Sequence, residues 1–180
     1  DTVQLAVCYD ELGVVYMLSG NFPKAHTNYH LALNLNKKIN NPARIARNYM
    51  NIGSNYLKTD SVDKGLSYFM VSLIIADSLK MEDEKIALMK NIGYGYARLG
   101  DYEDALKNFY GVLELLGERP DDLTRSEALV NIAMGYYNMG NYPAALKYAR
   151  QSYDLSKSRN FVQVHRDASG ILADIHAIQG

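Results

Sequence analysis

The chain repeats itself every 40 residues. Asn-Ile-Gly begins at residues 51 and 91, Asn-Ile-Ala begins at 131, and Glu11-Leu12-Gly13 and Ile171-Leu172-Ala173 stand in the same phase. A fixed period of this size is typical of repeat architectures, in which one supersecondary unit packs on the next and cannot bury its apolar face alone. The period therefore decides the fold class before composition is considered.

Each repeat is predicted to contain two amphipathic helices, because its apolar and small residues recur three, four and seven positions apart. A left-handed residue should end each first helix, and a polar N-cap should begin each second helix. The expected end residues are Gly20, Gly100 and Gly140, and the expected caps are Asn21, Ser61, Asp101 and Asn141. The helices are expected over residues 1–19, 22–39, 42–58, 62–80, 82–99, 102–117, 121–139, 142–158 and 161–178.

Small residues recur where two helix backbones are expected to cross closely, as at Gly93 and Ala105. Glycine within a helix costs about 1 kcal/mol relative to alanine, so close packing must offset that cost. Gly95 has no such explanation. Its equivalents in the other repeats are Val15, Asn55, Gly135 and Ile175.

The pattern Leu/Ile-Gly-x-x-Tyr, with Gly, Ala and Phe/Tyr further along, resembles the tetratricopeptide repeat. The period is longer than the family's usual 34 or so residues, and the family's frequent Trp is replaced by Tyr9, Tyr49, Met89 and Leu129. Similar long arrays occur in bacterial signalling and regulatory proteins. The resemblance implies an all-α, right-handed superhelix of helical hairpins whose first helices line a concave groove.

We expect a single array over residues 1–180, with four full repeats and one half repeat. The repeats would cover about 1–40, 41–80, 81–120 and 121–160, and the half repeat 161–180. Because residue 1 is Asp, the chain is interpreted as a processed chain or a fragment of a longer one.

Three aligned asparagines are the strongest functional feature. Asn51, Asn91 and Asn131 occupy the column that should face the groove, together with Glu11 and Ile171. An asparagine amide offers both donors and an acceptor, so a row of them suits the backbone of an extended peptide. The alternative is an intra-repeat bond to a neighbouring helix end, since asparagine often makes local bonds to the backbone.

Neighbouring groove columns carry charged and aromatic residues. Basic residues in the second and third repeats and acids further along would match a ligand that is acidic in its middle and basic toward the chain end; the alternative is an ordinary solvated face. The flanking residues predicted to line the groove are Arg47, Lys58, Lys90, Tyr94, Arg98, Glu127, Tyr137 and Asn138.

Other classes of site are disfavoured. His26 and His30 are four residues apart on a helix, but no third ligand stands in register, so no metal is expected. A net charge of −1 gives no field for nucleic acid, and no apolar run reaches the roughly 20 residues that span a bilayer. No motif of an enzyme or cofactor site is recognised, and the single cysteine, Cys8, leaves the compartment open.

The sequence thus predicts a non-catalytic module that binds a peptide or partner segment in its groove, within a larger bacterial regulatory protein. The alternative is a structural module that self-associates through open array ends or its convex face. Association through the ends would depend on Ile171, Leu172 and Ile175, whereas groove binding would depend on Asn91.

Overall fold

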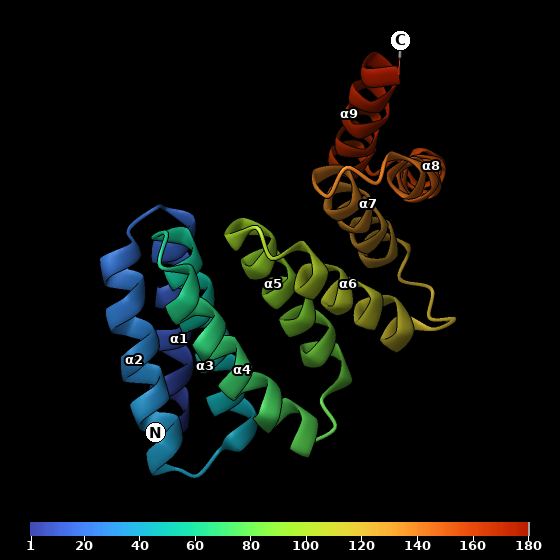
Figure 1. The fold of residues 1–180 in the computed structure, drawn as a ribbon. Coiled ribbons are helices and arrows are strands. Elements are labelled where there is room, and N and C mark those ends of the chain that lie inside the picture. Colours follow the sequence, from blue (N-terminus) through green and yellow to red (C-terminus); the bar gives the residue numbers. More distant parts are fainter. Residues whose placement is uncertain (180) are drawn as a thin grey trace. The chain divides into compact units, whose positions relative to one another are not determined.

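The computed structural model describes residues 1–179, which contain nine α-helices and no strand (Figure 1). Every helix begins and ends within two residues of its expected position. The helices are α1 Thr2–Leu18, α2 Phe22–Lys38, α3 Pro42–Lys58, α4 Val62–Ser78, α5 Glu82–Leu99, α6 Tyr102–Leu116, α7 Asp122–Asn138, α8 Tyr142–Arg159 and α9 Val162–Gln179.

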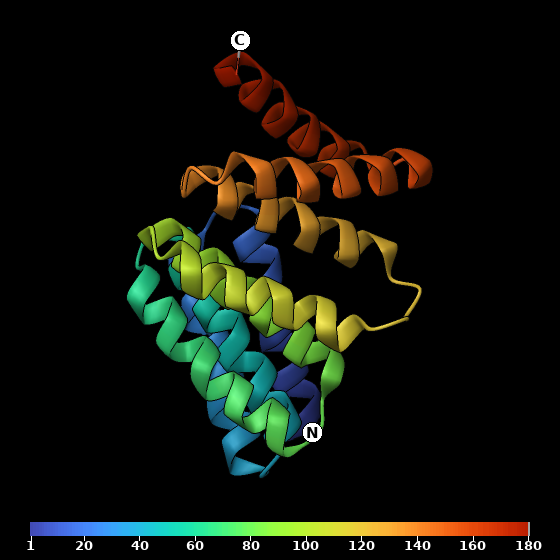
Figure 2. The same ribbon diagram turned by 45° about the vertical axis from the view of Figure 1, so that its right-hand side comes forward.

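The helices form two compact units, Asp1–Gly95 and the residues from Tyr96 onward. In the first unit α1 pairs with α2, α3 pairs with α4, and α2 packs on α3; in the second, α7 pairs with α8, while α6 packs on α7 and α8 on α9 (Figures 1 and 2). These helical hairpins are the expected all-α repeat fold. The single superhelical array stays a prediction, and Gly180 lies outside the described residues.

The turns within the repeats follow the expected chemistry. Gly20, Gly100 and Gly140 adopt φ values of 77°, 85° and 75°, the left-handed region that glycine adopts without a Cβ penalty. Asn21 and Asn141 accept hydrogen bonds from the backbone N–H of Lys24 and Ala144, each at 3.3 Å. The left-handed turn and the cap together reverse the chain between paired helices.

All four predicted residues occupy the N-cap position, but two of them cap the helix without a side-chain hydrogen bond. Ser61 and Asp101 occupy the cap position, but neither side chain makes a capping hydrogen bond. Their backbone carbonyls still accept the first hydrogen bonds of the helices, from the N–H of Gly65 and Ala105, each at 3.0 Å.

Close helix packing explains the small residue at Gly53, and Gly13 requires a correction. A Cβ added to Gly53 would lie 2.8 Å from the Phe69 ring and 3.0 Å from the carbonyl oxygen of Gly65, so the backbones do approach closely there. At Gly13 the obstacle is the ring of Tyr29, at 2.4 Å, rather than a crossing backbone. A tyrosine or phenylalanine on the second helix thus lies over the small residue of the first.

The repeat pattern left Gly95 unexplained, and the structure shows that Leu66 of the preceding repeat packs on it. A Cβ at Gly95 would be 2.6 Å from Cδ2 of Leu66 on α4. The same contact recurs in the second unit, where a Cβ at Gly135 would be 3.0 Å from Cδ2 of Leu106. These glycines therefore pack against the second helix of the preceding repeat.

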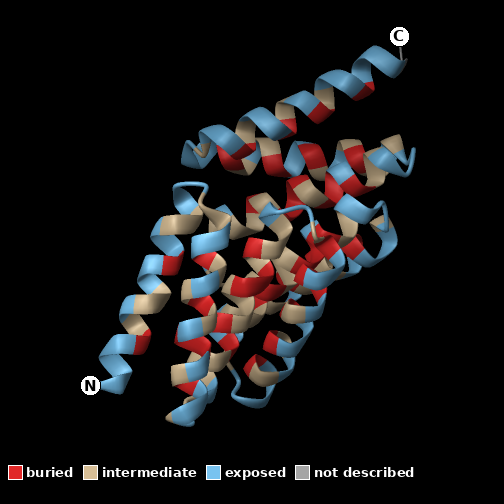
Figure 3. Ribbon diagram, turned by 90° about the vertical axis from the view of Figure 1, so that its left-hand side faces the viewer, coloured by how far each residue is buried: buried red, intermediate tan, exposed pale blue. Residues whose placement is uncertain are grey.

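Buried residues recur along the helices on the sides that face a neighbouring helix (Figure 3). Paired helices are also tied by buried serines: Ser72 Oγ donates to the carbonyl of Ala46 at 2.6 Å, and Ser152 Oγ donates to that of Ser126 at 2.8 Å. Helix α1 differs, since only Ala6 and Gly13 are buried in it. These cores hold the first helices in place, and those helices carry the candidate site.

Candidate binding surface on the first helices

All the residues predicted to line the groove lie on the first helices of repeats. Arg47, Asn51 and Lys58 are on α3, Lys90, Asn91, Tyr94 and Arg98 are on α5, and Glu127, Asn131, Tyr137 and Asn138 are on α7. Lys58, Arg98 and Asn138 are exposed, and Tyr94 is 37% exposed. The other side chains are half-buried, apart from the exposed Arg47.

A polar cluster joins α1, α2 and α3 in the first unit. Oδ1 of Asp10 accepts hydrogen bonds from the amides of Asn48 and Asn51, at 2.9 and 3.0 Å. The side-chain Oδ1 of Asn48 in turn accepts a hydrogen bond from the side-chain amide of Asn36 at 2.7 Å. The Asn51 amide is therefore bonded within the protein, but to a side chain of the preceding repeat rather than within its own, and it joins α3 to α1.

Asp10 is a charged group in a poorly solvated place. Burial raises the pKa of its carboxyl, while the amides of Asn51 and Asn48 and the positive charges of Arg44 and Arg47 act in the opposite direction. The same carboxylate adds to the effect of burial on Tyr29, whose pKa rises to about 12. A carboxyl group whose pKa is shifted by its surroundings marks a candidate functional position.

Sequence reasoning missed Asp10 and Asn48, although a signal was present. The equivalents of Asp10 in later repeats are Met50, Lys90, Val130 and Gly170, and those of Asn48 are Leu88, Ala128 and Ala168. An amide in a column that is otherwise apolar indicates a polar contact special to one junction.

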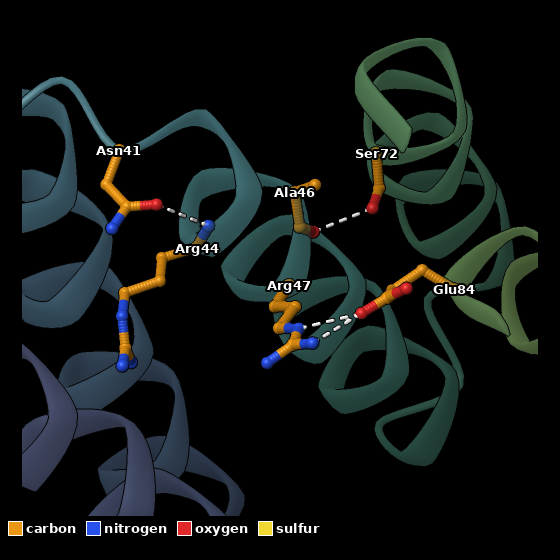
Figure 4. A network of polar contacts seen from close by, with 6 residues as sticks. All are labelled: Asn41, Arg44, Ala46, Arg47, Ser72 and Glu84. Carbon is orange, nitrogen blue, oxygen red and sulfur yellow. Dashed lines mark hydrogen bonds and ion pairs between the residues drawn. The ribbon is translucent and has the colours of Figure 1, made fainter. Parts of the chain in front are cut away.

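Arg47 makes an ion pair across the face of the first helices. Its Nε and Nη2 donate to Oε1 of Glu84 on α5, at 3.0 and 2.5 Å, as Figure 4 shows. The Arg44 guanidinium points away from this pair, toward α1 and α2 (Figure 4). Since the Arg47 side chain is 58% exposed, the pair orients the two groups but adds little stability.

The three asparagines of the row differ in what their amides bind. Asn51 donates to Asp10, and Asn131 donates to the carbonyl of Glu127 in its own helix at 2.7 Å. Within the described part of the chain, the half-buried Asn91 amide makes no hydrogen bond. Asn91 is thus the member of the row whose hydrogen-bonding groups are uncommitted.

The remaining predicted positions in the second unit differ in how far their side chains are engaged within the protein. Asn138 donates to the carbonyl of Met134 in its own helix at 3.0 Å, and Tyr137 packs against Tyr142 with ring centroids 5.9 Å apart. Ile171, predicted to face the groove, is instead 2% exposed in the core of this unit, together with Ile175. Helix α9 turns this side toward α7 and α8, because it packs on both.

His26 and His30 lie on α2, with ring centroids 4.4 Å apart. Among residues 1–179 no group of three His, Cys, Asp or Glu side chains is arranged to hold a metal ion. In the same residues no helix combines the length and the apolar character that a membrane span requires.

Replacing Asp10 with Asn should raise the free energy of unfolding at neutral pH, by on the order of 1 kcal/mol or less because solvent screens a half-buried charge. Asparagine keeps an acceptor for the two amides but removes the desolvated charge. Since the Asp10 pKa is raised in the folded state, its unfavourable effect should shrink as the pH falls through that raised value toward 3.8. Urea melts of both proteins across this range test the sign; a constant difference would contradict it.

Comparison with known proteins agrees with this architecture. Residues 84–158 match the model of the tetratricopeptide repeat family, and no curated protein matches the chain. Aspartyl phosphate phosphatase F from Bacillus subtilis is similar in structure, with a TM-score of 0.90 and 18% identity over 100% of this chain and 49% of the phosphatase.

Two further solved structures share the fold. A STAND signal-transduction ATPase from Pyrococcus horikoshii with a tetratricopeptide repeat sensor has a TM-score of 0.87 and 18% identity, over 95% of this chain and 27% of that protein. Kinesin-light-chain TPR-like repeats from Podosopora anserina have a TM-score of 0.75 and 13% identity, over 99% and 96% of the two chains.

The chain spans about half of the phosphatase and about a quarter of the ATPase. Identities of this size show a shared fold and nothing about shared activity, and the long-repeat subclass stays a prediction. Residues 84–158 thus match the tetratricopeptide repeat family, and the paired helices of both units have the fold of its solved members.

Proposed function

We propose that the chain is a non-catalytic protein-interaction module that binds an extended peptide or partner segment along its first helices. It would act as the sensory or scaffold part of a larger bacterial regulatory protein. Tetratricopeptide repeats generally serve as interaction modules, and one structural neighbour uses such repeats as a sensor. No residue of the chain is proposed to be catalytic.

The uncommitted amide of Asn91 is the observation that carries this proposal. In the repeat register, Asp10 precedes Asn51 by 41 residues, and Met50 precedes Asn91 by the same interval. A thioether is a weak acceptor, so the second junction offers no equivalent of the Asp10 carboxylate. Asn91 therefore keeps its donors and acceptor for a ligand backbone, whereas the Asn51 amide N–H donates to Asp10.

Charged and aromatic side chains on α3 and α5 in the first unit suit a polar segment. Arg47 and Glu84 offer both charges in one oriented pair, and Tyr94 presents a partly exposed ring on the same helix as Asn91. We propose that charges on this face select the partner, because charge complementarity contributes more to specificity and association rate than to affinity.

Self-association is a second candidate, and α1 favours it. Leu12, Val15 and Leu18 are 44%, 58% and 81% exposed, an apolar surface on the first helix of the chain. The earlier expectation that Ile171 and Ile175 mediate such contacts is wrong, because both side chains are buried in their own unit.

The test begins with peptides selected on the wild-type chain from a displayed library of short unstructured sequences. Calorimetry then compares wild type, Asn91→Ala and the control Asn108→Ala; Asn108 lies on α6, where its amide donates to the carbonyl of Asp104. One or two lost hydrogen bonds, at about 0.5–1.5 kcal/mol each, should weaken binding about three- to hundredfold in Asn91→Ala.

The control should bind as wild type does. Unchanged affinity in an Asn91→Ala, Asn131→Ala double variant, with its circular dichroism intact, would reject groove binding. Self-association would then be tested by sedimentation of wild type against Val15→Glu and Leu18→Glu.

A further inference from the structure

The junction between the first and second repeats differs from the others in its central contact. Leu66 packs on Gly95 at the second junction, and Leu106 packs on Gly135 within the second unit. The equivalent residues of the first junction are His26 and Asn55, which border the same surface depression of about 420 Å³. A polar, titratable pair therefore stands where later junctions use leucine against glycine.

A second contact at this junction is also polar. Asn36 and Asn48 are each 1% exposed and hydrogen-bonded to one another, whereas their equivalents one repeat later are the buried apolar pair Ala76 and Leu88. Oδ1 of Asn36 is buried without a hydrogen-bond partner, as is Oδ1 of Asn55. Partly satisfied polar groups of this kind weaken a packed interface relative to apolar ones.

Two histidines face tyrosines across this junction. The His26 ring is edge-on to Tyr56 of α3 at 5.3 Å, and the His30 ring is edge-on to Tyr68 of α4 at 6.5 Å. Nε2 of His30 is buried without a partner. The two imidazoles also contact each other, with ring centroids 4.4 Å apart.

The other titratable groups around the pair include two lysines and a third tyrosine. Lys37 of α2 lies 5.4 Å from the ring of Tyr49 on α3, and Lys64 of α4 lies 5.8 Å from the ring of Tyr56. Tyr49 and Tyr68 are themselves in contact, at 5.9 Å. Protonation would thus add positive charge to a site already flanked by two ammonium groups.

We propose that mild acid loosens the docking of the α1–α2 hairpin on α3 and α4, because protonation puts a positive charge on His30, whose ring contacts His26 and Tyr68 and whose Nε2 is buried without a partner. Undocking separates Asp10 from Asn51 and exposes the apolar residues of α3 that now pack on α2. This acid-dependent undocking would change which side chains of the first helices are available to a partner. It does not depend on the groove binding proposed above.

The direction of the pH dependence follows from the chemistry of His30. Burial lowers its pKa, with the charges of His26 and Lys37 adding to the effect, so the docked hairpin favours neutral imidazole. The contribution of neutral His30 to docking is therefore fully present above the ordinary histidine pKa near 6.5 and is lost as the pH falls below it. Asp10 has the opposite sign, since its pKa is raised above 3.8, and so it cannot cause this loss.

Hydrogen exchange of the whole chain tests the proposal. Protection factors, corrected for intrinsic rates, are compared between about pH 7.5 and about pH 5.5, a range that brackets the ordinary histidine pKa. In wild type we expect amides of α1 and α2 to lose protection by up to about tenfold per pH unit, the limit for the uptake of one proton. Amides of α7 and α8 should not change.

The decisive variant is His26→Leu, His30→Met, which carries the second repeat's residues at both positions. It should abolish the acid-dependent loss, whereas His176→Gln, at an exposed histidine of α9, and Asp10→Asn should leave it in place. Constant protection in wild type, or an equal loss in the double variant, would overturn the proposal. Should the double variant fail to fold, His30→Gln must reduce the loss on its own.

Discussion

Replacing Phe69 with Ala is expected to lower the free energy of unfolding by about 3–5 kcal/mol, the usual range for a buried phenylalanine. The ring is fully buried and lies against the site where a Cβ on Gly53 would be. No side chain on α3 can move into the vacated space at that position, because glycine has none. The cavity therefore stays open, and its cost adds to that of the lost apolar contact.

The neighbouring glycine offers a test of this explanation. Gly53→Ala should lower stability by about 1–3 kcal/mol through overpacking, since the new methyl group would meet both the ring and the Gly65 carbonyl. The combination of Gly53→Ala and Phe69→Ala should lose less than the sum of the two. The fourth repeat is a natural precedent, because Ala133 and Ala149 occupy these positions and both are fully buried.

Urea denaturation followed by circular dichroism measures these variants. Met70→Ala is the matched control: Met70 neighbours Phe69 on α4 but is 43% exposed, so its removal should change stability by about 0.5 kcal/mol or less. Strictly additive losses in the double variant would show that the ring and the glycine do not depend on each other.

The periodicity of the sequence was sufficient to predict the helices, because each hairpin uses contacts that recur at fixed spacing. Gly53 and Phe69 belong to columns that keep their character through most repeats. Gly95 could not be explained in this way. Its column is mixed, because the residue that fits there depends on the preceding repeat. Leu66 leaves room only for a glycine at position 95. Leu146, the equivalent of Leu66 two repeats later, is only partly buried, and Ile175 occupies the corresponding position in that core.

The candidate site was predictable in position and not in its bonding. Periodicity placed Asn51, Asn91 and Asn131 on one column of the first helices, and the structure places all three on such helices. Their hydrogen bonds depend on residues outside that column, above all on Asp10, which no repeat pattern pairs with Asn51. Polar contacts special to one junction cannot be read from a consensus of repeats.

The polar pair of the first junction should not be transferable to the second. Leu88→Asn is expected to lower the free energy of unfolding by about 3–5 kcal/mol. Loss of a buried leucine costs about 2–5 kcal/mol and an unsatisfied amide costs about 1–3 kcal/mol. The two costs overlap, because both describe the same buried position, and so they are not simply added. Leu88 is fully buried, and Ala76, in the place of Asn36, offers no side-chain partner.

The reverse exchange should be tolerated. A variant with Asp10→Met, Asn36→Ala and Asn48→Leu gives the first junction the residues of the second, and replacing both partners of a buried hydrogen bond with apolar groups is often neutral or stabilising. We therefore expect its stability in urea to equal or exceed that of wild type. A large loss in this variant would mean that the polar network stabilises the first hairpin. Loose docking of the α1–α2 hairpin would then be excluded. Loose docking requires that methionine, alanine and leucine at these positions stabilise the junction at least as well as Asp10, Asn36 and Asn48 do.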